Sequence, residues 1–185
     1  GSVVIGQPTP PTISTAMPTS IRARSAVLGG TVTSEGSTAV SERGVVYSRT
    51  QSTPTLQDER VAMGSGPGSF ADTVTLEPNS TYAVRAYAIS PAATVYGATR
   101  SFSTPSELFG TIAVVNGVAC FGGSNGRLRV NASGGVPPYS YLWSPGGSTA
   151  VEISGRPAGS YSVQVSDAIG QSLSLSTVLT QPPQL

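Results

Sequence analysis

Three aromatic side chains alternate along one short stretch of the sequence. Tyr139, Tyr141 and Trp143 stand at every second position within residues 134–147, which also hold two glycine pairs and three prolines. Because alternate residues of a β-strand point to the same face, the three rings share one side of a predicted strand. Exposed rings could stack on the C–H face of a sugar, whereas buried rings would fill the core of a β-sandwich.

The core is the favoured position for Trp143 and Tyr141. Burying one such ring removes ~150–250 Å² from water, and sandwich folds commonly hold a tryptophan at their centre. Tyr139 lies beside two prolines at the predicted rim of the strand. A core position is slightly favoured for Tyr139 too, and a sugar-binding position is the alternative, which makes it a candidate for ligand binding. The aromatic row as a whole is interpreted mainly as scaffold.

Residues suited to catalysis are missing from the sequence. The chain has no histidine, and its ten basic residues are all arginine. Ser-His-Asp and Cys-His nucleophiles, lysine Schiff bases and histidine metal sites are therefore excluded. Of the nine carboxylates only Asp58 and Glu59 are adjacent, and neighbours on a strand point to opposite faces, which makes a poor acid/base pair. The sequence predicts no catalytic residue, no enzyme activity and no cofactor.

A single cysteine and a few oxygen-bearing side chains complete the candidates for chemistry. Cys120 is either a reactive or intermolecularly bonded thiol or, as we favour, a buried small hydrophobe that has lost its partner. Asn116, Asn125 and Asp167 lie near glycine turns and could be imagined as calcium ligands. Calcium requires six to eight oxygens, so one aspartate among glycines predicts an Asx-turn and no metal site.

A corner tyrosine is predicted in the stretch Leu76 to Ser90. Its Leu-x-Pro-x-Ser-x-Tyr pattern is that of the tyrosine corner of β-sandwiches, in which the hydroxyl of the tyrosine, here Tyr82, bonds to nearby backbone. The alternation beyond it points Val84, Ala86 and Ala88 inward, and Arg85 and Tyr87 outward. The last two form a candidate contact patch, because both residue types are enriched at binding hot spots. A solvated strand face without binding is the alternative.

Composition favours an all-β protein without nucleic-acid or membrane contacts. Charged residues make up 10% of the 185 residues, against ~25% in typical domains, while glycine and proline number 22 and 15. The net charge is +1 with both signs scattered, and no apolar run approaches the ~20 residues that cross a bilayer. No signal peptide is recognisable, and Gly1-Ser2 resembles a cloning remnant, so we expect a piece of a longer protein.

Two domains are expected along the chain. Residues 1–9 are predicted to be a linker or an edge strand, and residues 10–105 a first β-sandwich of about seven short strands. Its clearest predicted strands cover residues 23–34, 41–48, 61–65, 70–76 and 94–104. Residues 106–185 form the second predicted sandwich, with two strands around a glycine-rich turn, the aromatic stretch, a strand at 148–153 and two more strands up to residue 182.

The first half resembles the fibronectin type III family, and more closely its variant in surface proteins of Bacteroidota-like bacteria. The resemblance spans about ninety residues. It rests on LGGTVTSEG (28–36), ERGVVYS (42–48), GSGPGSF (64–70), Leu76, Pro78, Tyr82 and YGATRSFST (96–104). It implies an immunoglobulin-like sandwich but no chemistry, and no Arg-Gly-Asp motif is present.

The second half resembles the SprB-type repeat of gliding-motility adhesins and other large surface proteins. The resemblance covers about seventy residues. The matching positions are Cys120, Gly126, Gly134, Gly135, Pro138, Tyr139, Tyr141, Trp143, Gly159, Tyr161, Val163, Val165, Asp167, Gln181 and Pro182. Two positions depart from the family: Gln171 stands where a second cysteine is common, and Arg156 where an apolar residue is usual.

Together the two resemblances imply a stalk or spacer. The expected protein is a tandem pair of immunoglobulin-like, fibronectin type III-like β-sandwiches from a bacterial surface or secreted adhesin, located outside the cell. A surface glycan or protein is the expected kind of partner, and the fragment is expected to be monomeric. The alternatives are an accessory module of a secreted glycosidase or protease, and a module of a trimeric bacterial or phage fibre.

Overall fold

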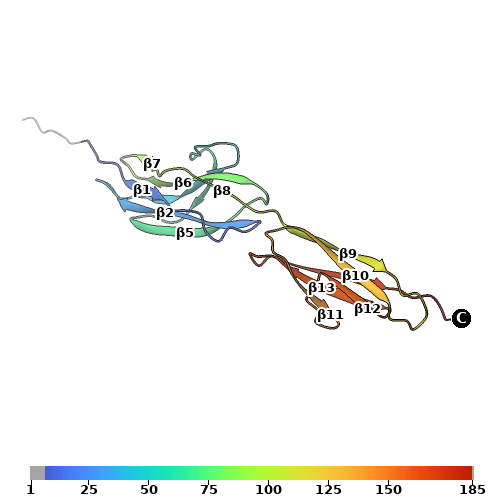
Figure 1. The fold of residues 1–185 in the computed structure, drawn as a ribbon. Helices are drawn as coiled ribbons and strands as arrows, with labels where there is room; N and C mark the ends of the chain where they lie inside the picture. The colour runs from blue at the N-terminus through green and yellow to red at the C-terminus, as the bar shows by residue number, and fades with distance from the viewer. Residues whose placement is uncertain (1–6, 185) are drawn as a thin grey trace, which may run out of the picture. The chain divides into compact units, whose positions relative to one another are not determined.

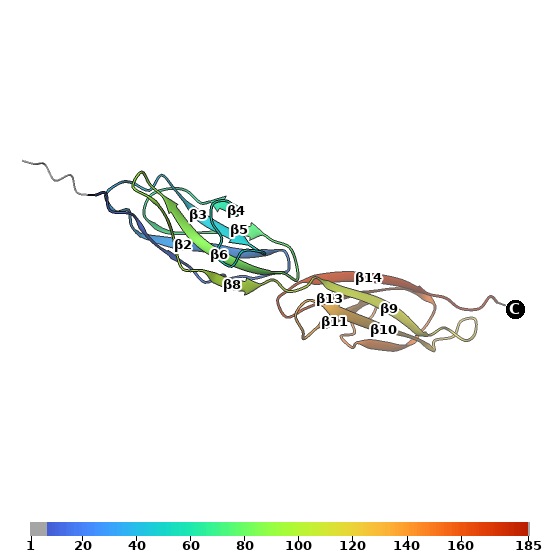
Figure 2. The same ribbon diagram turned by 90° about the horizontal axis from the view of Figure 1, so that it is seen from above.

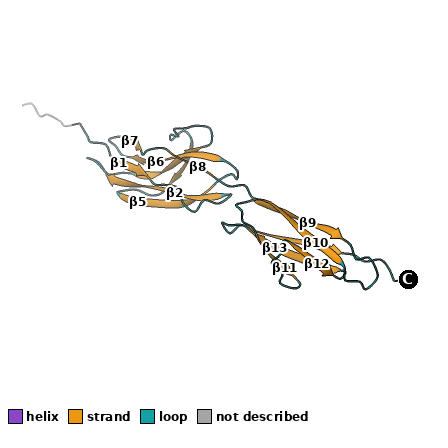
Figure 3. Cartoon of the chain, viewed as in Figure 1, coloured by secondary structure: helices purple, strands orange, loops and turns teal. Residues whose placement is uncertain are grey.

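The computed structural model describes residues 7–184, which contain fourteen β-strands and no helix (Figure 3). No helix able to span a membrane is therefore present in this described range. The chain divides into two compact units, residues 1–104 and 105–185, called unit 1 and unit 2 below. Of the predicted linker or edge strand, residues 1–6 lie outside the described range, and residues 7–9 have no regular secondary structure.

Unit 1 consists of two antiparallel sheets that face each other (Figure 1). The first sheet has the strand order β1-β2-β5, and the second has the order β4-β3-β6-β7, with β8 also paired to β6. The strands are β1 (Thr12–Thr15), β2 (Ser25–Ser34), β3 (Glu42–Ser48), β4 (Glu59–Ala62), β5 (Gly68–Thr75), β6 (Thr81–Ile89), β7 (Thr94–Tyr96) and β8 (Arg100–Ser103). Two packed antiparallel sheets of this kind are an immunoglobulin-like sandwich.

The core of unit 1 follows the alternation of β6. Tyr82, Val84, Ala86 and Ala88 are buried and point toward the facing sheet. Small residues let the sheets approach closely, since a Cβ atom built on Gly30 of β2 would lie 2.6 Å from the Ala86 Cβ. Both the alternation and the close contact make the two sheets one sandwich around one core.

One predicted strand of unit 1 is split in two. Residues 94–104 were expected to run as one strand, but β7 pairs with the end of β6 and β8 with its beginning. Between them, the Ala86 N–H of β6 donates to the buried Thr15 Oγ1 of β1, at 3.0 Å. The Thr15 hydroxyl accepts the hydrogen bond that a strand paired with β6 would otherwise accept. The ladder of backbone hydrogen bonds along β6 is therefore interrupted at Ala86. The predicted strand 61–65 also lies earlier, at Glu59–Ala62.

Unit 2 is a second sandwich of two three-stranded antiparallel sheets (Figure 2). One sheet has the order β12-β10-β9 and the other β11-β13-β14. The strands are β9 (Leu108–Asn116), β10 (Gly126–Gly134), β11 (Ser140–Ser144), β12 (Glu152–Arg156), β13 (Gly159–Ser166) and β14 (Ser172–Leu179). The strand predicted at 148–153 begins only at Glu152, because the Ser148 carbonyl accepts a 2.8 Å bond from the Trp143 N–H and closes a turn.

The core of unit 2 is assembled from both sheets around Trp143. Leu128 and Val130 of β10 face Val163 and Val165 of β13, and all four are at most 2% exposed. The alternation of apolar with polar residues along β10 and β13 produces this inner face. The chain is thus all-β, with two immunoglobulin-like sandwiches, as its composition and patterning predict.

In each unit the chain enters at one end of the sandwich and leaves at the other. In unit 2, Leu108 at the start of β9 pairs with Gly134, whereas Leu179 at the end of β14 contacts Gly126, eight residues away along β10. In unit 1 the chain enters β1 at Thr12, which pairs with Ser34, at the end of the sandwich where β2 finishes and β5 starts. It leaves at the end of β8, which pairs with Thr81, and Thr81 follows the end of β5 at the opposite end of the sandwich. In both sandwiches the chain therefore runs from one end to the other along the direction of the strands.

Candidate binding surfaces

The aromatic row of unit 2 points into the core. Trp143 is 1% exposed, and its indole N–H donates to the Ala150 carbonyl at 2.9 Å. Tyr141 is half-buried against the core, whereas Leu142, on the opposite face of β11, is 51% exposed. Trp143 and Tyr141 thus provide packing area, and the indole N–H is satisfied inside the protein.

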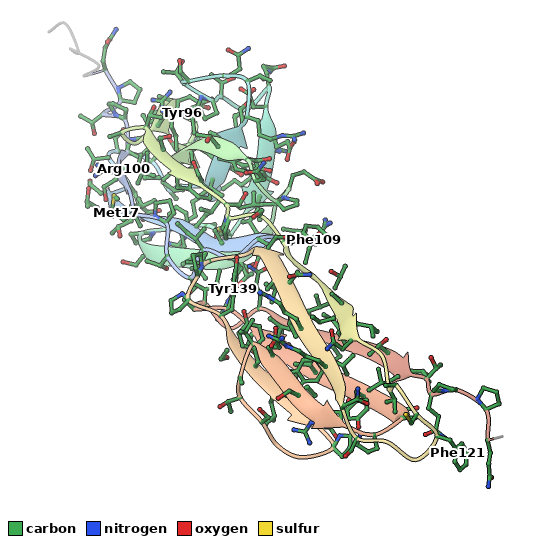
Figure 4. All side chains as sticks on the ribbon, turned by 45° about the vertical axis from the view of Figure 1, so that its right-hand side comes forward. Met17, Tyr96, Arg100, Phe109, Phe121 and Tyr139 are labelled. Carbon is green, nitrogen blue, oxygen red and sulfur yellow. The ribbon has the colours of Figure 1, made fainter. Side chains whose placement is uncertain are left out.

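Tyr139, the first residue of the aromatic row, is also held in place by contacts within unit 2. Its ring is half-buried and packs on the core, and its hydroxyl donates to the Gly134 carbonyl at 2.6 Å. Gly134 has a φ of 71°, a left-handed conformation that favours glycine. The Phe109 ring lies against this glycine and is 57% exposed (Figure 4). The aromatic surface open to solvent at this end is therefore mainly that of Phe109, which the sequence did not single out.

Tyrosine hydroxyls fix the backbone in both units. The Tyr82 hydroxyl accepts a 2.8 Å bond from the Glu77 N–H, five residues earlier, which is the corner predicted from the sequence. In unit 2 the Tyr161 hydroxyl donates to the Pro157 carbonyl, four residues earlier, at 2.9 Å. Sequence reasoning missed this second tie, although a tyrosine at the beginning of a strand, shortly after a proline, signals it in both cases.

The prediction that Tyr87 is an exposed contact residue is wrong. Its side chain is fully buried, and its hydroxyl donates to Glu42 Oε1 at 2.6 Å. The loop between β3 and β4 folds over this outer sheet face: its Leu56 N–H donates to the hydroxyl of Tyr96, the cross-strand neighbour of Tyr87. Burial and then the hydrogen bond to the Glu42 carboxylate raise the pKa of Tyr87 above its ordinary value.

Arg85, the other residue of the predicted patch, is occupied by contacts within unit 1. Its Nε donates to the Gly97 carbonyl at 3.0 Å, and its guanidinium lies 4.6 Å from the centroid of the Tyr96 ring. A cation above a tyrosine face is attracted by the ring quadrupole. Arg85 and Tyr96 therefore form part of the cover over the outer face, and Arg85 and Tyr87 do not form a joint exposed patch.

Cys120 is exposed, so the prediction of a buried thiol is wrong. It lies in the loop of residues 117–125, where the Ala119 N–H donates to Asn125 Oδ1 and the Gly122 N–H donates to Gln181 Oε1. Five apolar or soft side chains at this end line an open hollow of about 410 Å³: Ala119, Cys120, Phe121, Pro182 and Pro183. Phe121 is 53% exposed (Figure 4).

Gln171, the position at which the sequence resemblance implies a second cysteine, lies at the opposite end of unit 2 from Cys120. Gln171 precedes β14 and Gln181 follows it, and a strand of this length covers roughly 26 Å at ~3.3 Å per residue. A disulfide needs Cα atoms within ~7 Å of each other. Residues 120 and 171 therefore cannot be disulfide partners within one unit.

Asp167 organises the turn between β13 and β14. Its Oδ1 accepts bonds from the Ile169 and Gln171 N–H groups, and its Oδ2 accepts bonds from the Val136 N–H and the Gln171 side chain. Burial opposes ionisation, but these donors outweigh it and hold the pKa of Asp167 below its ordinary value. Because Asn125 lies in the 117–125 loop at the other end of unit 2, the imagined calcium ligands do not converge.

A hollow of about 310 Å³, lined mainly by residues with polar side chains, lies on the outer face of the second sheet of unit 1. It is lined by Ser48, Arg49, Thr50, Gln51, Ser52, Thr81, Tyr82, Ala83, Thr99 and Ser101. Nothing in the sequence signals this hollow, because its residues come from two loops and three strands that only the sheet register brings together. This hollow, called the outer-face hollow below, and the apolar hollow at Cys120 are the two candidate binding surfaces.

Comparisons with known proteins identify part of unit 2. Residues 112–148 match the SprB repeat family. No curated protein matches the sequence of this chain. Among solved structures, the C-terminal 282-residue fragment of intimin, in complex with the intimin-binding domain of the translocated intimin receptor, is 12% identical with a TM-score of 0.49, covering 96% of this chain and 64% of that one.

Two further solved structures match this chain. The sensor domain of the anti-sigma factor RsgI4 of Pseudobacteroides cellulosolvens is 18% identical with a TM-score of 0.38, and the match covers 52% of this chain and 95% of that one. The FN1–FN3 domains of chicken CNTN1 are 16% identical with a TM-score of 0.34, covering 97% and 70% of the two chains. The family match is the more specific of the findings: the segment that runs from within β9 to the turn after β11 is similar to the SprB repeat.

Proposed function

We propose that this chain is a non-catalytic spacer segment of a large bacterial surface adhesin. The observation that carries the proposal is the match of residues 112–148 to the SprB repeat, a family that the sequence resemblance connects with surface adhesins. A spacer holds a distal binding site away from the cell and must tolerate tension along the chain. The side chains singled out for chemistry are largely engaged in packing and in backbone ties, which is in keeping with a scaffold.

The path of the chain through unit 2 supports a role under tension. β9 and β14 lie side by side and run in the same direction, with the chain entering at Leu108 and leaving at Leu179. Pulling these two points apart loads the β9–β10 and β13–β14 ladders along the strand direction. Their hydrogen bonds, which lie across the strands, must then yield together and not one after another. Such loading makes the unfolding rate the limiting quantity.

Immunolabelling of cells that produce the parent protein tests the proposal. Antibodies against this chain are expected to label intact cells, and brief protease treatment of the cell surface should remove the label. Signal found only in the culture medium, copurifying with a hydrolase activity, would instead identify the chain as an accessory module of a secreted enzyme. Light scattering of the isolated chain separates a monomeric spacer from a module of a trimeric fibre.

A further inference from the structure

The floor of the outer-face hollow is made by small side chains in register. Ser48 of β3 pairs with Ala83 of β6, and Ala83 pairs with Ser101 of β8. Residues that pair across strands share one face of a sheet. The larger Arg85 lies on the same face two residues further along β6. The hollow therefore exists because three neighbouring strands each place a small residue at the same level.

Most lining side chains of the hollow can form hydrogen bonds, and several of them have no partner. Ser48 Oγ accepts bonds from the Thr50 and Gln51 N–H groups, and the Thr81 hydroxyl shares a bond with Ser103, so these two are used. Within the described residues 7–184, five other lining side chains make no hydrogen bond or ion pair: Arg49, Gln51, Ser52, Thr99 and Ser101. They offer one guanidinium, one amide and three hydroxyls.

One positive charge lines the hollow, and two carboxylates lie in a neighbouring hollow. Arg49 is the only ionised side chain among the lining residues, and no carboxylate is among them. Glu59 and Glu77 line a smaller neighbouring hollow of about 120 Å³ that Arg49 also borders. Burial, and after it the neighbouring Glu59 carboxylate, raise the pKa of Tyr47 to about 12. Neither carboxylate forms an ion pair with Arg49, whose guanidinium makes no hydrogen bond within residues 7–184. An anion that enters the hollow can therefore pair with it.

We propose that the outer-face hollow binds one acidic sugar residue of a polysaccharide, with its anionic group on Arg49. A planar guanidinium pairs bidentately with a carboxylate, the hydroxyls and the amide match the hydroxyls of a sugar ring, and Ala83 offers an apolar floor for the ring's C–H groups. The volume of about 310 Å³ is at the lower end of small-ligand pockets, which suits a single ring better than a peptide or a lipid chain. This binding site goes beyond the spacer role.

Binding of simple glycosides to the full chain tests the proposal. The probes are methyl β-D-glucuronide, methyl β-D-glucoside and sodium sulfate, measured by titration calorimetry or by NMR shifts of residues around Ala83. We expect saturable binding of the glucuronide, at least tenfold tighter than that of the glucoside. Arg49→Gln should weaken glucuronide binding at least tenfold, and Ser101→Tyr, at an exposed position of the floor, should block it.

Arg100→Gln is the matched control. Arg100 is exposed (Figure 4) and lies between Thr99 and Ser101 in the sequence, but it is not part of the lining. Its replacement therefore removes the same charge and leaves the hollow intact. This variant should bind glucuronide within twofold of the parent chain. Equal affinity for glucuronide and glucoside, equal losses in the two arginine variants, or sulfate binding as tight as that of glucuronide would each overturn the proposal. Equal affinities or equal losses would show that Arg49 does not pair with the carboxylate of the sugar. Tight sulfate binding would show that the hollow binds anions in general.

Discussion

Unit 1 and unit 2 have the same architecture but differ in the charge and the covering of their outer surfaces. Both bury an alternating apolar face, and both anchor a tyrosine hydroxyl to the backbone before a central strand. Unit 1 contains seven of the ten arginines and folds the loop between β3 and β4 over its outer sheet face, burying Tyr87. Unit 2 has three arginines and leaves Phe109, Phe121 and Val178 more than half exposed. The scaffold is thus common to both units, and any specific binding must come from loops and outer faces.

Replacing the central ring of unit 2 is expected to have the largest effect. Trp143→Ala should cost ~3–5 kcal/mol, the range for deleting a large buried aromatic side chain, and so leave unit 2 largely unfolded. NMR spectra should lose the dispersed signals of unit 2 while those of unit 1 remain. Leu142→Ala is the control, because this neighbour is 51% exposed and should change stability little. A Trp143→Ala protein that stays folded would contradict the scaffold role of the ring.

Asp167→Asn should have the second-largest effect on the free energy of unfolding, and this effect should depend on pH. Removing this buried carboxylate should cost ~1–3 kcal/mol at pH 7, because its backbone donors lose their charged acceptor. The folded-state pKa is lowered, so the stabilisation is fully present above the unfolded-state value of ~3.9 and is lost as the pH falls through the folded-state pKa. Urea unfolding from pH 7 to pH 2.5 should show the two proteins converging in acid. A constant difference across this range would rule out the charged carboxylate as the cause.

Removal of the two tyrosine hydroxyls compares the units directly. Tyr82→Phe and Tyr161→Phe should each cost on the order of 1 kcal/mol, the net value of one hydrogen bond with a partly buried partner. Each loss should appear only in the unfolding transition of the unit that holds the tyrosine. Thermal unfolding followed separately in the two units measures it. A change within error for Tyr82→Phe would remove the hydroxyl from the interactions that stabilise unit 1.

The Cys120 thiol should show the smallest effect on stability. Because it is exposed, iodoacetamide should modify it in the folded protein, and Cys120→Ser should change the unfolding free energy by less than about 0.5 kcal/mol. Mass spectrometry after native labelling measures the reaction, with urea-unfolded protein as the reference. A thiol that reacts only after unfolding would restore the buried position expected from the sequence.

The sequence predicts features that depend on local spacing and misses those that depend on register or on loop paths. Alternation identifies the inner faces of β6 and β10 and the core position of Trp143. Alternation cannot show that a distant loop covers Tyr87, so an outward residue was taken for an exposed one. The outer-face hollow was missed for a related reason, since Ser48, Ala83 and Ser101 become neighbours only through strand pairing. Cys120 was predicted to be buried because it is small and apolar, but residue type alone does not show whether a loop is exposed.

Stretching single molecules held at their two ends tests the spacer function most directly. Because the chain runs through each sandwich from one end to the other along the strands, we expect two discrete unfolding steps. Unit 1, with the longer chain, should give the longer extension, and Trp143→Ala should abolish only the shorter step. A chain that lengthens gradually without discrete steps would contradict the account, since neither unit would then withstand tension.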